Sequence, residues 1–534
     1  MLWYAIVFIS GGAVLALELL ASRILTPYFG VSLFIWTGIL SITLLALALG
    51  YWTGGRLAAS PSADADVGRL AQRYASMPAL AALAIIAACL AYPELFPCFA
   101  AADLVLGAFA ACLTLLFVPL VALSAMSPLL VSIQLARDGS RTAGVGTGTV
   151  FFVGTLGSVV GVLVTALGLI PYLSNFAATL AVALALALLT AVAATRLPAP
   201  LRGRRSLALG AAGATVLAAF LLWQADAYLE RLWPAEYGGA SWRVEARFGS
   251  RFGTVKILRS APDPSGGFAQ IYFQDGLIQN SVTSDGRSLQ LYTYALEALA
   301  YAYRPQLRSA LVLGLGAGIV PMRLARQGVA VEAVEVDPAS LAAATGFFGF
   351  DAERVPVHLA DARTQLARCP RRYEVILVDL FHGDGTPEHL VTRDFFADLR
   401  RCMEPDGVAI FNTIAVLERP TAYAHLLVTL RAELPHVALY RPDWPGSPHV
   451  NSFIVASAAP LPIPRQVSLD TLPPQHARTL PAMLAHPQAL RPELLEGGEI
   501  VTDARSPAVH DVAEGQLSYR RALIGSLPPA FLVD

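Results

Sequence analysis

The segment ILVDLFHGDGTPEHLVTRDFF, residues 376–396, gathers side chains that can bind a metal ion or exchange a proton. They are Asp379, His382, Asp384, Glu388 and His389. A metal site would need the last four to converge, but their spacing matches no common ligand pattern, and the glycines and proline between them favour an irregular turn. We therefore predict no metal here and interpret the two histidines as solvated or lid residues. Asp379 follows an apolar, strand-like run, and a carboxylate placed there can take a proton from a substrate.

Glycine-rich and acidic residues also follow three earlier predicted strands. The stretch SALVLGLGAGIVPMRLARQGVAVEAVEVDP predicts a strand, a glycine-rich turn, a helix and a second strand. VPVHLADARTQL predicts a third strand, and YEVILVDLF predicts the fourth. Ligands of such sheets bind beyond the carboxyl ends of the strands, so we expect one site there. The residues at that edge are Gly314, Gly316, Gly318, Glu335, Asp337, Asp361 and Asp379.

The residue types at this edge favour an adenosine ligand. Glycines allow backbone N–H groups to approach a ligand at a helix N-terminus. An acidic residue at the end of the second strand, Glu335, can accept hydrogen bonds from ribose hydroxyls. The G-x-G-x-G pattern alone is a weak signal. The turn Asp361-Ala362-Arg363 suits a purine amino group, and nothing resembles a redox partner site, so we predict adenosine rather than a dinucleotide.

The chain divides by composition into an apolar part and a more polar part. Residues 1–225 carry 16 charged side chains and residues 226–534 carry 61. The net charge of −1 indicates no nucleic-acid partner. Seven apolar segments in the first part have about the 20-residue length that spans a bilayer. They lie roughly at 2–22, 33–53, 77–97, 104–123, 146–170, 174–195 and 206–224. We predict a multi-pass α-helical domain, residues 1–225, in the cell (inner) membrane, with the lipid bilayer as its partner.

Small residues inside these segments indicate helix contacts. Gly144-x-x-x-Gly148 and Gly157-x-x-x-Gly161 have the spacing that lets helices pack closely in lipid. An Ala/Gly-rich composition would give the same pattern without any contact.

One acidic side chain, Glu18, lies well inside the first apolar segment, and Arg23 lies near the end of that segment. A carboxylate in hydrocarbon is costly, which makes Glu18 a candidate functional group. The alternative is a structural role, in an ion pair with Arg23 or in a hydrogen bond to another helix.

Residues 226–534 predict a soluble part made of several pieces. We expect a linker at 226–250, a small β element at 251–300, an α/β domain at 301–460 and a C-terminal extension at 461–534 in which we find no chemistry. The β element contains RFGTVKILRS and FAQIYFQDGLIQNS. The five cysteines, at positions 89, 98, 112, 369 and 402, have neither metal-ligand nor disulfide spacing.

With these motifs in order, residues 254 to about 458 resemble the spermidine synthases, the polyamine aminopropyltransferases. The matching pieces are FQDGLIQNS, VLGLGAGIV, VEVDP, the LADAR turn, and VDLF with the P, L, T and FF that follow it. The segments LALELLASRILTPYFG and TLGSVVGVLVTALGLIPYL resemble those of membrane-fused spermidine-synthase-like proteins. The resemblance implies a Rossmann-like, methyltransferase-type fold for the α/β domain and a homo-oligomer.

The resemblance also implies substrates and residue roles. The co-substrate would be decarboxylated S-adenosylmethionine, with no prosthetic group, and the acceptor a small amine, usually putrescine. By position, Glu335 would hold the ribose, Asp361 with Ala362 the adenine, and Gln279 would line the cleft. Asp379 would orient the attacking amine and take its proton, since an ammonium must lose a proton before it attacks the carbon beside a sulfonium.

The chain departs from the family pattern at three places. Soluble members have G-G-G-D-G, whose Asp helps to hold the aminopropyl group, and this chain has Ala317 there. Their D-x-x-D-P is replaced by Asp379 and the run Leu-Phe-His-Gly-Asp384, which makes Asp384 a candidate for the second Asp. Their Tyr-His-Glu corresponds to Tyr292-Thr293-Tyr294, which makes Tyr292 a possible substrate residue. The departures affect amine-binding groups and leave the adenosine pocket intact.

Two other functions fit the same residues. Ala317 favours methyl transfer from S-adenosylmethionine, or another cleavage of that molecule, because the side chain that would hold the aminopropyl group is missing. Glu18 favours a polyamine transporter or sensor whose soluble part binds ligand without turnover. We predict the aminopropyltransferase.

Two arguments about the side of the membrane on which the soluble part lies give opposite answers. Arginine-rich loops follow the second, fourth and sixth apolar segments, and the loops after the third and fifth carry no Arg or Lys. The positive-inside rule makes the arginine-rich loops cytoplasmic, which leaves the soluble part outside when seven segments span. The donor is a cytoplasmic metabolite, and for that reason we favour the cytoplasm.

Overall fold

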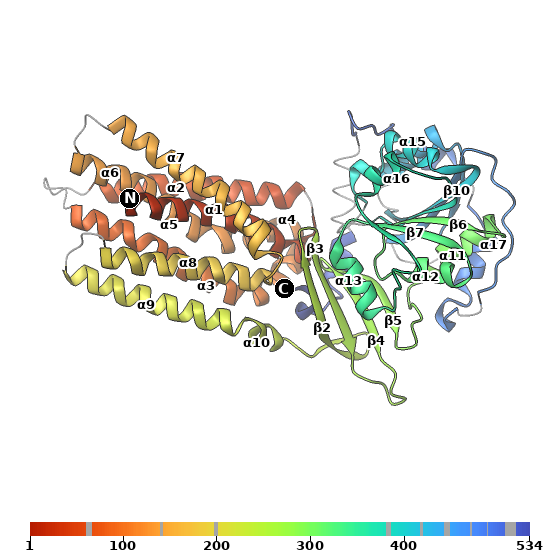
Figure 1. Ribbon diagram of the computed structural model, residues 1–534, viewed down its shortest axis with the longest axis horizontal. Helices are drawn as coiled ribbons and strands as arrows, with labels where there is room; N and C mark the ends of the chain where they lie inside the picture. The colour runs from red at the N-terminus through yellow and green to blue at the C-terminus, as the bar shows by residue number, and fades with distance from the viewer. Residues whose placement is uncertain are drawn as a thin grey trace. The chain divides into compact units, whose positions relative to one another are not determined.

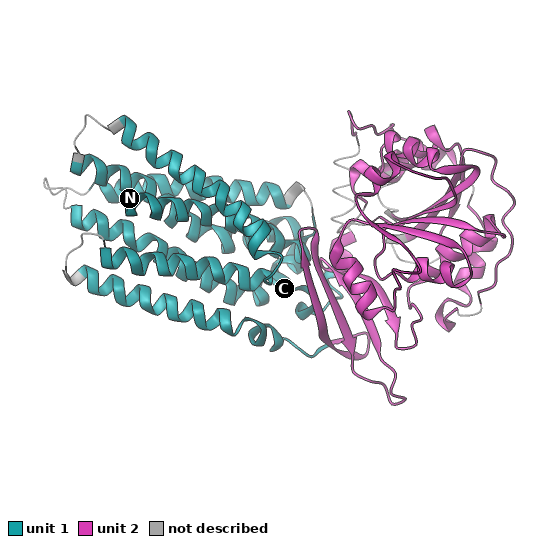
Figure 2. Ribbon diagram, in the orientation of Figure 1, with its two compact units in different colours: residues 1–235, 524–534 teal, residues 236–523 magenta. Residues whose placement is uncertain are grey.

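The computed structural model describes residues 1–31, 33–59, 67–138, 143–196, 201–380, 386–416, 420–442, 449–469, 472–488, 490–507 and 519–533. It contains two compact units, which Figure 2 colours separately. The first comprises residues 1–235 and 524–534, and the second comprises residues 236–523. The last residues of the chain therefore belong to the same unit as the first.

The first unit consists of long apolar helices (Figure 1). Within the described ranges, seven helical stretches are long and apolar enough to cross a bilayer, and each overlaps one of the seven predicted segments. This part of the chain is therefore compatible with a multi-pass membrane protein. The helices are α1 (Leu2–Phe29), α2 (Leu33–Ala58), α3 (Val67–Ala102), the consecutive α4 (Leu104–Cys112), α5 (Val118–Ser124) and α6 (Met126–Asp138), α7 (Ala143–Val164), α8 (Asn175–Arg196) and α9 (Leu201–Trp223).

Helices α1 and α7 approach each other through glycine. A Cβ added to Gly157 would lie 2.0 Å from the carbonyl oxygen of Phe8, and one added to Gly161 would lie 2.3 Å from that of Gly12. This pair of glycines therefore serves close packing, as its spacing predicts. A Cβ on either glycine of the Gly144–Gly148 pair would meet nothing within 4 Å, so that pair makes no such contact among the described residues.

Glu18 lies on α1 beside Thr43 of α2. No ion pair joins Glu18 to Arg23 in the part of the chain that the structure describes. Of the two structural roles considered for Glu18, an ion pair with Arg23 or a hydrogen bond to another helix, its surroundings therefore fit the second.

The second unit begins with a five-stranded antiparallel sheet in the order β1-β2-β3-β4-β5. Its strands are β1 (Ala235–Tyr237), β2 (Ala240–Ser250), β3 (Gly253–Ser260), β4 (Ala269–Gln274) and β5 (Leu277–Thr283). Residues 226–250, which we expected to be a linker, instead contain most of α10 (Ala225–Glu230) together with β1 and β2. Their apolar signal is weak because β2 carries Arg243, Glu245 and Arg247 on alternate positions, so no apolar run marks the strand.

A seven-stranded mixed sheet follows, in the order β8-β7-β6-β9-β10-β12-β11. Among the described strands of this sheet, β12 alone runs in the direction opposite to the other six. The chain order reverses between β6 and β9, which is the point where such doubly wound sheets bind ligands. The strands are β6 (Ser309–Leu313), β7 (Ala330–Glu335), β8 (Val357–Leu359), β9 (Tyr373–Val378), β10 (Met403–Val416), β11 (His436–Tyr440) and β12 (His449–Ser457).

Helices cover both faces of this sheet, as Figure 1 shows for α11 and α12 on one side and α15 and α16 on the other. The sheet has a hydrophobic core on each face. On β6, Ala310 and Val312 belong to one core, whereas Leu311 and Leu313 belong to the other. Strands buried on both faces are continuously apolar, which is why SALVLGL could be predicted as a parallel strand. The helices are α11 (Leu291–Tyr303), α12 (Ile319–Arg326), α13 (Pro338–Phe347), α14 (Ala362–Ala367), α15 (Arg393–Arg401), α16 (Pro420–Glu433) and α17 (Thr479–Ala485).

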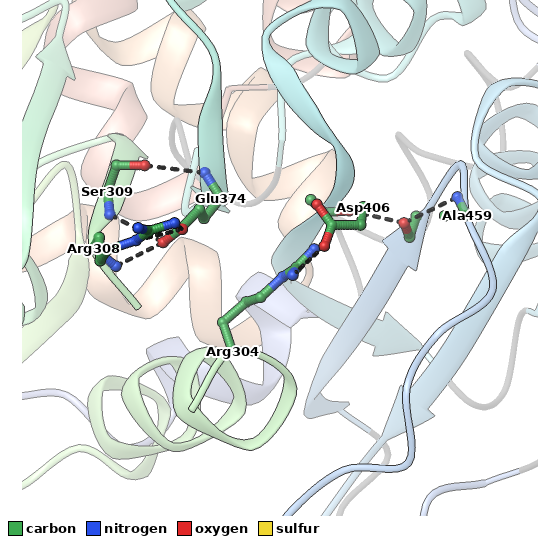
Figure 3. Close-up of polar contacts among 8 residues, drawn as sticks. Arg304, Arg308, Ser309, Glu374, Asp406 and Ala459 are labelled. Carbon is green, nitrogen blue, oxygen red and sulfur yellow. Dashed lines mark hydrogen bonds and ion pairs between the residues drawn. The ribbon is translucent and has the colours of Figure 1, made fainter. Parts of the chain in front are cut away.

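The amino ends of the central strands are held by ion pairs, shown in Figure 3. Glu374, at the start of β9, accepts hydrogen bonds from the backbone N–H of Arg308 at 2.6 Å and from its Nη2 at 3.0 Å. Arg304, after α11, bonds Asp406 of β10 at 2.6 Å. These charges satisfy one another, and they lie at the edge opposite to the predicted ligand site.

Two cysteines form a disulfide that their spacing does not predict. Cys369 and Cys402 are 33 residues apart, and their Cα atoms are separated by 5.8 Å. Cys369 follows α14 and Cys402 follows α15, and the parallel pairing of β9 with β10 brings these two helix ends together. The expectation of no disulfide is therefore wrong, because the contact arises from strand pairing and not from local sequence.

The glycine contact between α1 and α7 can be tested by substitution. Gly157→Leu should lower the thermal unfolding temperature of the detergent-solubilised chain, because its side chain would occupy the position of the Phe8 backbone and overpacking costs about 1–3 kcal/mol. Gly148→Leu, on the same helix in open space, is the matched control and should leave that temperature unchanged. Equal effects of the two substitutions would contradict the contact.

Candidate active site

A cleft in the second unit opens at the carboxyl ends of the sheet strands, next to β4 and β5. Most of the predicted site residues line it together, although they come from six separate segments of the sequence. Those residues are Gln279, Tyr292, Gly314, Gly316, Glu335, Asp337, Asp361, Ala362 and Asp379. Gly318 is not among the lining residues, and Asp384 and His382 lie outside the described residues.

The glycine-rich turn after β6 requires glycine for three different reasons. All three glycines have positive φ, a region that other residues rarely adopt. A Cβ on Gly314 would lie 2.1 Å from the carbonyl oxygen of Asp379. A Cβ on Gly316 would meet no atom within 4 Å, so the backbone there faces open space in the cleft. Gly318, at the start of α12, packs against the ring of Phe350, where a Cβ would come within 2.5 Å.

Glu335, at the end of β7, ties this turn to the neighbouring strand. Its Oε2 accepts a hydrogen bond from the backbone N–H of Leu315 at 3.0 Å, and its Oε1 accepts one from that of Asp337 at 2.8 Å. Burial raises the pKa of this carboxyl, and the two backbone N–H groups oppose the rise. A carboxylate has about four lone-pair sites, so two remain that can accept hydroxyl groups of a ligand.

Asp337 and Asp361 are both helix caps as well as cleft residues. Asp337 Oδ1 accepts the backbone N–H of Ala339 at 2.9 Å, which caps α13. Asp361 Oδ1 accepts that of Thr364 at 2.9 Å, which caps α14. Each carboxylate therefore already stabilises a helix, and its second oxygen is what could meet a ligand.

Asp379 follows β9 and is held by an amide side chain. Asn412 Nδ2 of β10 donates to Asp379 Oδ1 at 2.9 Å, and Asn451 Nδ2 of β12 donates to Asn412 Oδ1 at 3.0 Å. Burial raises the pKa of Asp379 to about 6, the hydrogen bond from Asn412 opposes the rise, and the charge of Glu335 adds to it. A carboxyl with this pKa is ionised at neutral pH and still accepts a proton readily.

Tyr292 lies on the β-element side of the cleft. Its hydroxyl donates to the carbonyl oxygen of Gln279 at 3.1 Å and accepts from Asn280 Nδ2 at 3.1 Å. Burial, and next the charge of Asp379, raise the pKa of this phenol, so the two side chains are electrostatic neighbours. Tyr294 faces elsewhere, because its hydroxyl donates to the carbonyl oxygen of Ser288 at 2.8 Å.

Ala317 does not face the cleft. Its side chain is buried with Val255, Ile257 and Tyr272 of the β element, and only 2% of its surface is exposed. In this structure the position serves packing between the glycine turn and the first sheet.

Of the four residues that a metal site would need to bring together, only Glu388 and His389 lie in the described part of the chain. His389 Nε2 lies 3.7 Å from Asp361 Oδ2, and its side chain is 56% exposed. Burial raises the pKa of the nearby Glu388 carboxyl. Within the described ranges, no three metal-ligating side chains come together.

Sequence reasoning missed Asn412, Asn451 and Tyr519, which also line the cleft. The two asparagines lie in strands whose pairing is antiparallel, with Ile414 of β10 opposite Asn451. A polar residue inside the apolar run VAIFNTIAV is the one local signal that pointed to Asn412. Tyr519 comes from the C-terminal extension, and no pattern in its surroundings pointed to it.

With this geometry established, the comparison with known families gives a match to the spermine/spermidine synthase domain over residues 289–446. Residues 289–446 form a spermine/spermidine synthase domain. The matched range covers α11, the glycine-rich turn and the three acidic strand ends, Glu335, Asp361 and Asp379.

Three curated relatives are each similar to part of this chain. The polyamine aminopropyltransferase of Vibrio vulnificus is 32% identical over 136 residues, which cover 24% of this chain and 44% of that enzyme. The polyamine aminopropyltransferase of Pyrobaculum calidifontis is 26% identical and is covered over 69% of its length, with 36% of this chain. The N-terminal histidine N-methyltransferase of Emericella nidulans is 33% identical over 20% of this chain and 19% of its own length. The chain thus spans less than half of the first of these relatives.

Proposed function

We propose that the chain is a membrane-bound aminopropyltransferase. It would transfer the aminopropyl group of decarboxylated S-adenosylmethionine to a small amine such as putrescine. One observation carries the proposal: in the cleft of a spermine/spermidine synthase domain, the partly buried Asp379 is an electrostatic neighbour of Tyr292 and has a pKa of about 6. That group can orient an amine and take its proton.

In this proposal the donor lies along the carboxyl ends of β6, β7 and β8. The free lone pairs of Glu335 would accept the ribose hydroxyls, and the open backbone at Gly316 would let the nucleoside approach. Asp361 and the buried Ala362 would border the adenine. These groups are fixed before any ligand arrives because backbone bonds already hold each carboxylate, and such preorganisation reduces the entropy lost on binding.

The transfer step would be a displacement at carbon. The lone pair of the neutral amine forms a C–N bond to the aminopropyl carbon beside the sulfonium, and the C–S bond breaks. The electron pair of the broken C–S bond stays on sulfur, and the leaving group is therefore neutral methylthioadenosine. Before the attack, Asp379 takes the proton that the acceptor's ammonium group must lose and passes it to water, and the product nitrogen keeps the positive charge that it gains on forming the new bond. Holding the amine and the carbon in line would supply much of the rate.

A second candidate is methyl transfer from S-adenosylmethionine. Ala317 supports it, because this position is packed into the core and offers no carboxylate to an aminopropyl ammonium. One curated relative that is similar to part of this chain is an N-methyltransferase. The two functions differ in the donor, since methyl transfer requires the carboxylated form and leaves S-adenosylhomocysteine.

The role of Asp379 is tested by Asp379→Asn. The full chain carrying this substitution should lose aminopropyl transfer by at least about a hundredfold, the usual size of a general-base contribution, and still bind methylthioadenosine. Product formation is followed by chromatography and nucleoside binding by calorimetry. Asp406→Asn, at the opposite end of the sheet, is the control and should keep the wild-type rate. A normal rate for Asp379→Asn would refute the proposed role.

The pH dependence of transfer follows from the pKa of Asp379. Only the ionised carboxylate accepts a proton, so kcat/KM should fall about tenfold per pH unit below about pH 6. Asn412→Leu removes the hydrogen bond that lowers this pKa, so the acid limb should move to higher pH. The profiles of wild type and variant are measured in one buffer series. An acid limb that stays at the same pH would contradict the assignment.

The proposed donor also fixes a location for the second unit. Decarboxylated S-adenosylmethionine is a cytoplasmic metabolite, so we place the synthase domain in the cytoplasm, against the arginine distribution over seven spans. A C-terminal fusion to a reporter that is active only in the cytoplasm should therefore be active. Activity of an export-dependent reporter instead would contradict both the location and the choice of donor.

A further inference from the structure

A short helical segment of the C-terminal extension, residues 519–523, reaches the cleft. Tyr519 is one of the residues that line the cleft. The next side chain, Arg520, has no exposed surface and is the largest fully buried side chain among the described residues. A buried guanidinium is costly unless it is hydrogen-bonded, so its position is strongly determined.

Arg520 is anchored on the turn that joins β4 to β5. Its Nη1 donates to the carbonyl oxygen of Asp275 at 3.2 Å, across 245 residues of sequence. Asp275 has φ 49 and is itself buried, and its Oδ1 accepts the backbone N–H of Thr254 at 3.0 Å. A Cβ on Gly253 would lie only 2.1 Å from Asp275 Oδ2, so the glycine at the start of β3 leaves the space that this carboxylate occupies.

The same turn carries one wall of the cleft. Gln274 and Leu277, on either side of the turn, both line the cleft, and Gln279 follows two residues later. The carbonyl oxygen of Gln279 accepts the hydroxyl of Tyr292, the electrostatic neighbour of Asp379. The wall that Arg520 holds is therefore continuous with the groups around the proton-accepting carboxylate.

We infer that Tyr519 binds the acceptor amine and that Arg520 is the positioning residue that holds Tyr519 in the cleft. An ammonium group is attracted electrostatically to the face of a tyrosine ring. The donor's nucleoside would be held by residues that follow β6, β7 and β8. Tyr519 instead adjoins Arg520, whose guanidinium bonds the β4–β5 turn, so we assign Tyr519 to the amine. This inference rests on the proposed aminopropyl transfer.

The test compares variants of the full chain in detergent. Tyr519→Ala should raise KM for putrescine about tenfold and leave the Kd for methylthioadenosine unchanged. Tyr519→Phe keeps the ring and should stay within about twofold of wild type. Arg520→Gln should raise KM for the amine in the same way, and Arg520→Lys should restore part of it. Arg521→Gln, at the exposed neighbouring position, is the matched control and should behave as wild type.

The outcomes separate this inference from the proposed function. An active wild type in which Tyr519→Ala has an unchanged KM for the amine overturns the inference alone. An equal loss of amine and nucleoside binding also overturns it, because it would show a general disturbance of the cleft. A wild type without transfer activity overturns the proposed function together with the inference. If Arg520→Gln fails to fold, the two Tyr519 variants decide the case.

Discussion

The main-chain and side-chain contacts of Asp379 join three neighbouring strands at one point. Its backbone N–H donates to the carbonyl oxygen of Leu313 of β6 at 2.9 Å, and its carboxylate accepts from Asn412 of β10. Its own carbonyl oxygen occupies the space that a Cβ on Gly314 would need. The position of this carboxylate, and with it the geometry of the glycine turn, therefore depends on the pairing of β6, β9 and β10. Since the pairing is buried on both faces, the site has little freedom to move.

The two ends of the same sheet use charge in opposite ways. At the amino ends, Glu374 and Asp406 are paired with arginines, and such exposed pairs contribute little free energy but leave no charge without a partner. At the carboxyl ends, Glu335, Asp361 and Asp379 accept hydrogen bonds from N–H groups of the backbone or of an amide side chain. No cation is paired with Glu335 or Asp379 in the described part of the chain. Carboxylates held in this way keep lone pairs for a ligand, and burial raises the pKa of both.

Much of the fold, and the placement of the strand-end residues in one cleft, could be predicted because both follow from local sequence. Parallel strands are apolar on both faces and end in a loop at a known edge, so Glu335, Asp361 and Asp379 could be placed together from four short patterns. The seven long apolar helices follow from length and apolar composition in the same way. Gly318 shows the limit of such reasoning, because its pattern is that of a ligand-binding glycine and its reason is contact with Phe350.

The features that could not be predicted depend on contacts between distant parts of the chain. Asn451 reaches the site through the register of β12 on β10, and Cys369 meets Cys402 through the pairing of β9 with β10. Arg520 bonds the β4–β5 turn, and Tyr519 lines the cleft, from a segment more than 200 residues away from that turn. The polar strand β2 gives no apolar run, so we expected a linker there. Each of these depends on tertiary geometry that no window of sequence contains.

The central claim, that this cleft transfers an aminopropyl group, is tested most directly by following the transferred atoms. The full chain in detergent is incubated with decarboxylated S-adenosylmethionine labelled in its aminopropyl carbons, with and without putrescine, and both products are measured by mass spectrometry. Our account predicts label on the amine and an equal amount of methylthioadenosine, and neither product when the amine is omitted. Release of methylthioadenosine without an amine, or transfer of the methyl group alone, would contradict it.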